Sequence, residues 1–168
     1  METTHDRSHQ NSQMLRAPRI ATLPLPSVAY SEETPHSILT YEDPALVNYD
    51  LRRHPSDARP RYPRLVRLTW CYESAMHPAV STLTLTCGIL PQLIVVTPSH
   101  SGFEFVIVQD VLLAVHEAYQ VTVNEHHGPT ATDSDPSFLR EHSTVLTRHM
   151  WGGISEQSGP GQWRVHIE

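Results

Sequence analysis

The stretch from Ser81 to Val121 constrains the fold most, because it holds a strand, a turn, a second strand and a helix in close succession. In Ser81–Cys87, leucines alternate with threonines, which is the period-two pattern of a strand with one buried face. Gln92–Thr97 is mostly apolar, and we expect a second, more fully buried strand there. The Gly88–Pro91 connection suits a hairpin, so the two strands are expected to pair antiparallel.

Helical spacing follows the second strand. Asp110 stands near the start of a predicted helix over Gln109–Val121, where a carboxylate favours the positive end of the helix dipole. A second helix is predicted over Ser137–Met150, because Asp135-Pro136 is a favourable helix opening and Gly152-Gly153 would stop it. The apolar stripe of the first helix consists of Val111, Leu112, Val115, Ala118 and Tyr119.

Two shorter segments, Val47–Leu51 and Trp163–Ile167, also alternate, and we expect the second of them to lie beside the hairpin. His36–Tyr41 is expected to form a short helix or turn, and residues 1–35 a disordered, proline-containing tail. The sequence therefore predicts an α+β fold over residues 36–168 as a single domain. Its small, mainly antiparallel sheet would pack against two helices.

The basic residues are unusual, because all 12 are arginine and the 168-residue chain has no lysine. The missing lysine excludes Schiff-base catalysis and argues against a P-loop. Cys71 and Cys87 are the only cysteines, too few for a disulfide framework and without zinc-knuckle spacing. With neither a signal-like apolar segment nor an apolar run of bilayer length, we expect a cytoplasmic protein without membrane contact.

Half of the arginines fall within one loop broken by prolines, Arg52–Arg67, where no regular helix is expected. Arginine forks bind carboxylates and phosphates, and nearby aromatic faces can stack on a ring or base. The simpler alternative is a solvated loop whose arginines pair with this chain's own carboxylates, as Arg52 would with Asp50. The candidate ligand-binding residues are Arg52, Arg53, Arg59, Arg61, Arg64, Arg67, Tyr62 and Trp70.

Histidine is as abundant as arginine, with 12 residues. Its ring titrates near neutral pH, so His77, His116, His142 and His149 are candidates for acid–base catalysis, with solvated surface histidines as the alternative. His142 and His149 are seven residues apart, which is about 10 Å along a helix and too far for one ion. No HExxH or GxSxG motif occurs. We therefore predict no metal and no cofactor.

Three hypotheses for function stay open at the level of the sequence. The first is a small interaction or ligand-binding module, with an anionic ligand or a protein bound at the arginine loop. The second is a small enzyme that uses histidine, tyrosine or carboxylate acid–base chemistry in a pocket between sheet and helices. The third, nucleic-acid contact through Arg52–Arg67, is disfavoured by the net charge of −6.

Six segments of the chain stand in a recognisable order: Asn48–Arg52, Ser81–Thr86, Leu93–Val96, Val108–Leu112, Trp151–Gly153 and Gly161–Ile167. Their order and spacing resemble an uncharacterised domain family of mushroom-forming basidiomycete fungi. The resemblance runs from about His36 to the end and implies a fold rather than an activity. The chain departs from the family pattern at Glu73–Ala79, where Met76-His77-Pro78 replaces a small-residue, proline-rich turn.

Overall fold

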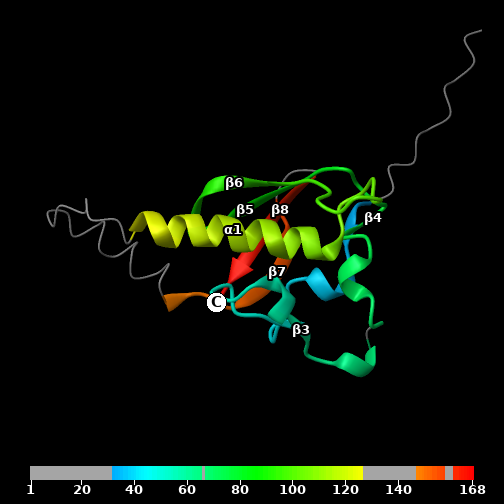
Figure 1. Ribbon diagram of the computed structural model, residues 1–168, viewed down its shortest axis with the longest axis horizontal. Coiled ribbons are helices and arrows are strands. Elements are labelled where there is room, and N and C mark those ends of the chain that lie inside the picture. Colours follow the sequence, from blue (N-terminus) through cyan, green and yellow to red (C-terminus); the bar gives the residue numbers. More distant parts are fainter. Residues whose placement is uncertain (1–31, 66, 127–146, 158–160) are drawn as a thin grey trace, which may run out of the picture. The chain divides into compact units, whose positions relative to one another are not determined.

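A four-stranded sheet with a long helix on one face forms the centre of the fold (Figure 1). The computed structural model describes residues 32–65, 67–126, 147–157 and 161–168. The strand order is β6-β5-β8-β7, and helix α1 packs along β6. The elements are β5 (Leu83–Cys87), β6 (Leu90–Val96), α1 (Val108–His126), β7 (Trp151–Glu156) and β8 (Gln162–Ile167).

The strand pairing confirms the predicted hairpin. β5 and β6 run antiparallel, with Leu83 opposite Val96. β8 lies beside β5 as predicted and runs parallel to it, whereas β7 pairs antiparallel with β8. The α+β class is therefore confirmed, and the helix predicted over Gln109–Val121 is present as the longer α1.

The core lies between the sheet and α1. Alternate residues of β5 and β8 are buried, which is the reason that the period-two pattern was visible in the sequence. Trp151 and Trp163 are both almost fully buried at the β7–β8 side of this core. The helix contributes its predicted apolar stripe, of which Val111, Leu112, Val115 and Tyr119 are buried.

The predicted second helix is wrong at its C-terminal end. Met150 forms a β-bridge with Asp50, and Gly152-Gly153 lie inside β7 instead of ending a helix. Gly153 has a φ of +117°, and a Cβ atom there would lie 2.6 Å from the Cα atom of Tyr41. The glycine is thus needed for a close backbone crossing. Residues 137–146 of the predicted helix lie outside the described residues, and Thr147, the first described residue after them, is helical.

The expectation that the second strand of the hairpin is more fully buried is also wrong. β6 is at the edge of the sheet, and α1 covers only one of its faces. Leu93 and Val95 point to the other face and are 65% and 60% exposed. Apolar composition alone did not distinguish a buried strand from an edge strand with apolar residues on both faces.

The chain before β5 forms small pairs of strands and single turns. β1 (Thr34–Pro35) pairs with β4 (Met76–His77), and a 3-10 turn at Ser37–Leu39 confirms the predicted short helix or turn. β2 (Val47–Asn48) pairs with β3 (Arg59–Pro60). The predicted strand over Val47–Leu51 is shorter than expected, although its alternating residues Val47, Tyr49 and Leu51 are buried. Residues 1–31 of the predicted tail lie outside the described residues.

The arginine loop has no α-helix, as its prolines predict, but it contains 3-10 turns. These are η2 (Pro55–Asp57) and η3 (Pro63–Leu65), and η4 (Trp70–Tyr72) follows shortly after the loop. Both η2 and η4 contact α1. The Pro55–Asp57 turn of the loop is thereby held against the helix, whereas Arg61, Tyr62, Arg64 and Arg67 are exposed.

Candidate functional site

A groove of about 310 Å³ lies between the arginine loop and the N-terminal half of α1, and we call it the loop groove. One wall comes from η2, β3 and η4, and the other comes from α1. Two of the predicted ligand-binding residues, Arg59 and Trp70, meet in it. Its lining consists of Pro55, Ser56, Ala58, Arg59, Leu68, Trp70, Cys71, Tyr72, Gln109 and Leu112.

Large apolar side chains are unusually accessible at the loop groove. Leu68 is fully exposed, and Tyr72 is 48% exposed. Trp70 is half-buried, with part of its ring packed against the core. A half-buried tryptophan beside an exposed leucine and tyrosine offers an apolar contact surface whose orientation the fold already fixes.

Three arginines hold the loop in shape. Arg52 forms an ion pair with Asp50 at 2.7 Å, which confirms the predicted pair. The hydrogen bond from Arg52 lowers the pKa of the Asp50 carboxyl. Arg59 donates to the carbonyl of Ala58 at 2.8 Å, and Arg61 donates to the carbonyl of Ala45 at 2.8 Å. These contacts are structural, and they leave part of each guanidinium open to a ligand.

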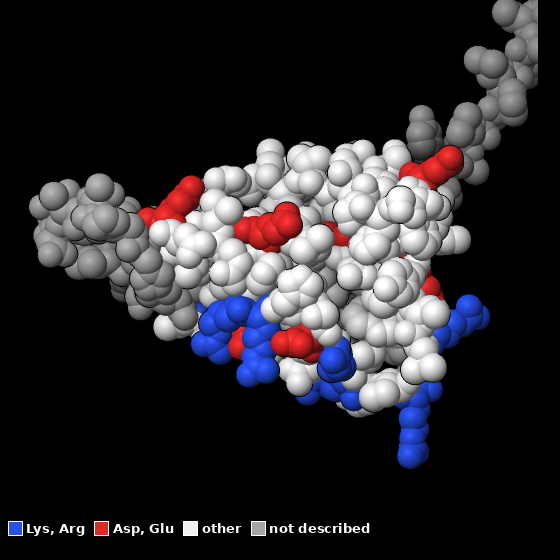
Figure 2. Space-filling view, viewed as in Figure 1, with Lys and Arg blue, Asp and Glu red and all other residues white. Residues whose placement is uncertain are grey.

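The other three arginines of the loop, Arg53, Arg64 and Arg67, are exposed, and their side chains make no hydrogen bond or ion pair to the described residues. Figure 2 shows basic side chains gathered below α1 on the face in view, although acidic groups also lie among them. Tyr62 is 49% exposed and lies outside the lining of the groove. The predicted set thus divides into two groove residues and six residues elsewhere on the loop.

Asp110 positions the wall that η4 contributes, a role that sequence reasoning missed. Its carboxylate is 2% exposed and accepts hydrogen bonds from the backbone N–H groups of Ile107, at 2.9 Å, and Ser99, at 3.2 Å. A ring nitrogen of His100 lies 3.3 Å from it, and the His100 ring meets the Tyr72 ring edge-on. An acidic residue at the third position of a helix is a capping signal, but Ser99 and His100 could not be assigned to it from the sequence.

Glu73 fixes the same wall from its other end. The backbone carbonyl of Glu73 accepts from the N–H of Val108, the first residue of α1, at 3.0 Å. Its side chain lies 3.0 Å from a ring nitrogen of His36. Because η4 is bonded to α1 and to the N-terminal segment, the loop groove is preformed.

The predicted catalytic histidines do not come together. The Nδ1 atom of His116 lies 2.9 Å from the carbonyl oxygen of Leu51, which is a structural contact between helix and loop. His77 is exposed on β4, His149 bonds the Thr147 carbonyl, and His142 lies outside the described residues. In the part of the chain that the structure describes, no three His, Cys, Asp or Glu side chains are grouped as metal ligands.

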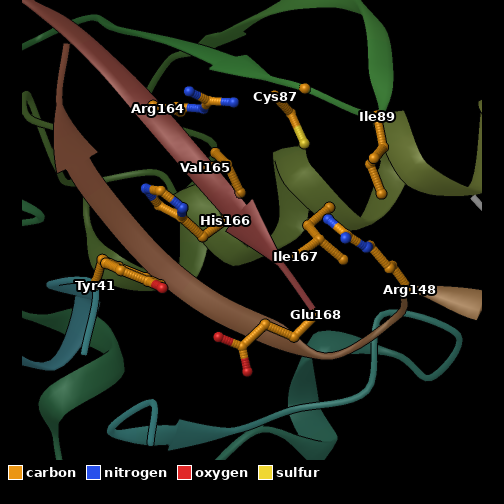
Figure 3. Close-up of a pocket in the computed structure, with 10 residues that line it drawn as sticks. Tyr41, Cys87, Ile89, Arg148, Arg164, Val165, His166, Ile167 and Glu168 are labelled. Carbon is orange, nitrogen blue, oxygen red and sulfur yellow. The ribbon is translucent and has the colours of Figure 1, made fainter. Parts of the chain in front are cut away.

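A second cavity of about 160 Å³ lies on the sheet beside β8 (Figure 3). The rings of Tyr41 and His166 stack there, with centroids 3.9 Å apart. The Nε2 atom of His166 is 2.8 Å from the hydroxyl of Ser155, and burial, aided by Arg164, lowers the pKa of His166. A neutral imidazole can accept a proton from a serine. However, Ser155 lines a different cavity, of about 250 Å³, so the two groups do not face one substrate space.

Neither cysteine is an activated nucleophile. Both are half-buried free thiols, and burial raises the pKa of Cys71 and of Cys87. A raised thiol pKa keeps the less nucleophilic, protonated form at neutral pH. Cys71 therefore contributes to the loop groove as a small apolar side chain.

The fold and the loop groove define a small α+β domain with a preformed surface site. The chain belongs to a family of unknown function, DUF6699, which matches residues 47–150. No curated protein and no solved structure matches it. Among the described residues, no helix is long and apolar enough to cross a membrane. The cytoplasmic location and the fungal distribution stay predictions.

Proposed function

We propose that this domain is a binding module that recognises acidic peptide segments of other proteins through the loop groove. One observation carries the proposal: exposed Leu68 and Tyr72, half-buried Trp70 and Arg59 share one preformed groove on an arginine-rich loop. Tryptophan, tyrosine and arginine are the residues that contribute most at protein interfaces.

The size of the groove favours a side chain over a cofactor. Pockets for drug-sized ligands have volumes of about 300–1,000 Å³. The loop groove, at about 310 Å³, is at the lower limit of this range. One large apolar side chain of a peptide would fill it and would contact the Trp70 ring.

The positive charge of the arginine loop favours acidic residues on either side of the apolar side chain of that peptide. Asp57 is the sole acidic residue among the six arginines of Arg52–Arg67, and the rest of the chain brings the net charge to −6. Carboxylates on either side of an apolar anchor would meet the side chains of Arg64 and Arg67, which have no partner among the described residues. Because these arginines are exposed, they would contribute to encounter rate and specificity more than to affinity.

The proposal is tested by fluorescence anisotropy with three labelled 12-residue peptides. The first has a central leucine flanked by glutamates, the second replaces the leucine by serine, and the third replaces the glutamates by arginines. We expect a Kd of about 1–100 µM for the first peptide, at least tenfold weaker binding for the second and none for the third. Binding of the first peptide should weaken as salt rises from about 0.05 to 0.5 M.

Matched variants locate the binding. The double variant Arg64→Ala/Arg67→Ala should weaken the first peptide about tenfold, whereas Arg148→Ala, beside the cavity of Figure 3, should leave its binding unchanged. Equal weakening by both variants would refute a site at the loop groove. A single-stranded oligonucleotide that binds more tightly than the peptide would favour the nucleic-acid hypothesis instead.

The enzyme hypothesis retains one specific observation, the Ser155–His166 pair. It is tested with a fluorophosphonate, which reacts with the hydroxyl of an activated serine. Labelling that disappears in Ser155→Ala and in His166→Gln would support an acyl-transfer enzyme. Failure to label the native chain would remove this hypothesis without affecting the binding proposal.

A further inference from the structure

Among the described residues, none pairs with the outer edge of β6. β6 is the longest strand of the sheet, with seven residues, and it is the last strand in the order β6-β5-β8-β7. Its inner edge pairs with β5, and no backbone hydrogen bond joins its outer edge to another described residue. An open strand edge presents a row of donors and acceptors to any strand that approaches.

The devices by which natural proteins protect such an edge are nearly absent from β6. Its sequence, Leu-Pro-Gln-Leu-Ile-Val-Val, holds no charged residue, and Pro91 stands only near its start. In Figure 2 the surface where Figure 1 places β6 is mostly uncharged, and one acidic group lies beside it. Leu93 and Val95, adjacent on the outer face, are 65% and 60% exposed. An edge that is long, apolar and without charge favours association.

The surroundings of β6 hold this edge in a fixed position. α1 packs against its inner face, where Ile94 and Val96 are buried. On the outer face, Val95 lies opposite Thr84 of β5, so the neighbouring surface is polar but uncharged. A rigid strand loses little entropy when a second strand pairs with it.

We propose that β6 pairs antiparallel with β6 of a second copy of this chain, across a two-fold axis at Ile94. This register places Leu93 of one copy opposite Val95 of the other, and the same contact occurs twice. The two sheets would then form one continuous sheet of eight strands. A two-fold contact requires a self-complementary surface, and the apolar pair around Ile94 has this property.

The absence of charged residues from β6 allows a second copy of this acidic chain to pair with it. Each chain has a net charge of −6, so two copies repel unless they meet where charge is absent. The edge of β6 meets this condition on both sides of the contact. The surface involved is small, so the dimer belongs to the weak class of interfaces, below about 1,200 Å².

Sedimentation equilibrium of the full chain, from about 5 to 500 µM, tests the proposal. We expect the mass to rise from that of the 19.0 kDa monomer toward twice this value. Val95→Lys should weaken the association at least tenfold, because lysine on an edge strand opposes pairing. Val121→Lys is the matched control, since Val121 is an exposed valine (45%) on α1, and it should associate like the native chain.

A charge exchange tests the register. Leu93→Glu alone should also be monomeric, but an equimolar mixture with Val95→Lys should dimerise, because the introduced ammonium then faces the introduced carboxylate. A native chain that stays monomeric up to about 500 µM would overturn the proposal. So would equal weakening by Val95→Lys and Val121→Lys, or a mixture that associates no more than either variant alone. Arg64→Ala/Arg67→Ala should leave the dimer intact, which separates this inference from the proposed function.

Discussion

Replacement of Asp110 by alanine should destabilise the domain strongly, although the change affects one carboxylate. The fully buried N–H of Ile107 would lose its charged acceptor, which costs about 1.5–3 kcal/mol. Loss of negative charge at the helix N-terminus adds about 0.5–1 kcal/mol. The N–H of exposed Ser99 can bond water and adds about 0.5 kcal/mol. We therefore expect the free energy of unfolding to fall by about 3–4 kcal/mol.

Urea denaturation followed by circular dichroism measures this loss. Asp110→Asn keeps one acceptor oxygen without the charge and should lose about half as much. Glu117→Ala is the matched control, because Glu117 is an exposed acidic residue on the same helix, and it should change stability by less than about 0.5 kcal/mol. If Asp110→Ala lost no more than Glu117→Ala, the buried carboxylate would not be the link between α1, the loop before it and Tyr72.

Two further predictions concern backbone conformation and pH. Gly153→Ala should lower the free energy of unfolding by more than about 3 kcal/mol, because the added Cβ would lie 2.6 Å from the Tyr41 Cα. Gly102→Ala is the control, because Gly102 also has a positive φ but has nothing within 4 Å of the added Cβ. This variant should cost only about 1 kcal/mol of backbone strain. Similar losses of stability in Gly153→Ala and Gly102→Ala, measured by thermal denaturation, would contradict the close approach of the backbone at Tyr41 to Gly153. Burial lowers the pKa of His166 in the folded chain, so the unfolded chain takes up this proton first as pH falls below about 6.5, and stability declines there. His166→Gln should reduce the drop in Tm between pH 7.5 and 5.5; an unchanged drop would show that other groups cause it.

The parts of the fold that the sequence predicted are those set by local patterns. Alternation located β5 and β8, and helical spacing located α1, because burial of one face repeats with the period of the element. The errors occurred where a distant segment decides the conformation. In the sequence, the glycines of β7 resemble a helix stop. Their actual role depends on the backbone of Thr40 and Tyr41, which lies against Gly153 and is distant in sequence.

The same division applies to the site. Composition identified the arginine loop, and Arg59 and Trp70 do line the loop groove. The opposite wall, Gln109 and Leu112, could not be predicted, because it depends on how η4 is bonded to α1. The histidine candidates stay predictions, and the described structure places His77, His116 and His149 in separate parts of the fold.

The most direct test of the loop groove is the fluorescence of Trp70 during titration with the glutamate-flanked leucine peptide. Trp151 and Trp163 are 2% and 3% exposed, so a surface ligand should alter the emission of Trp70 alone. We predict a shift to shorter wavelength that saturates with the Kd measured by anisotropy and that is absent in Trp70→Phe. A saturating shift that persists in Trp70→Phe, or peptide binding that leaves the emission unchanged, would contradict a site at this groove.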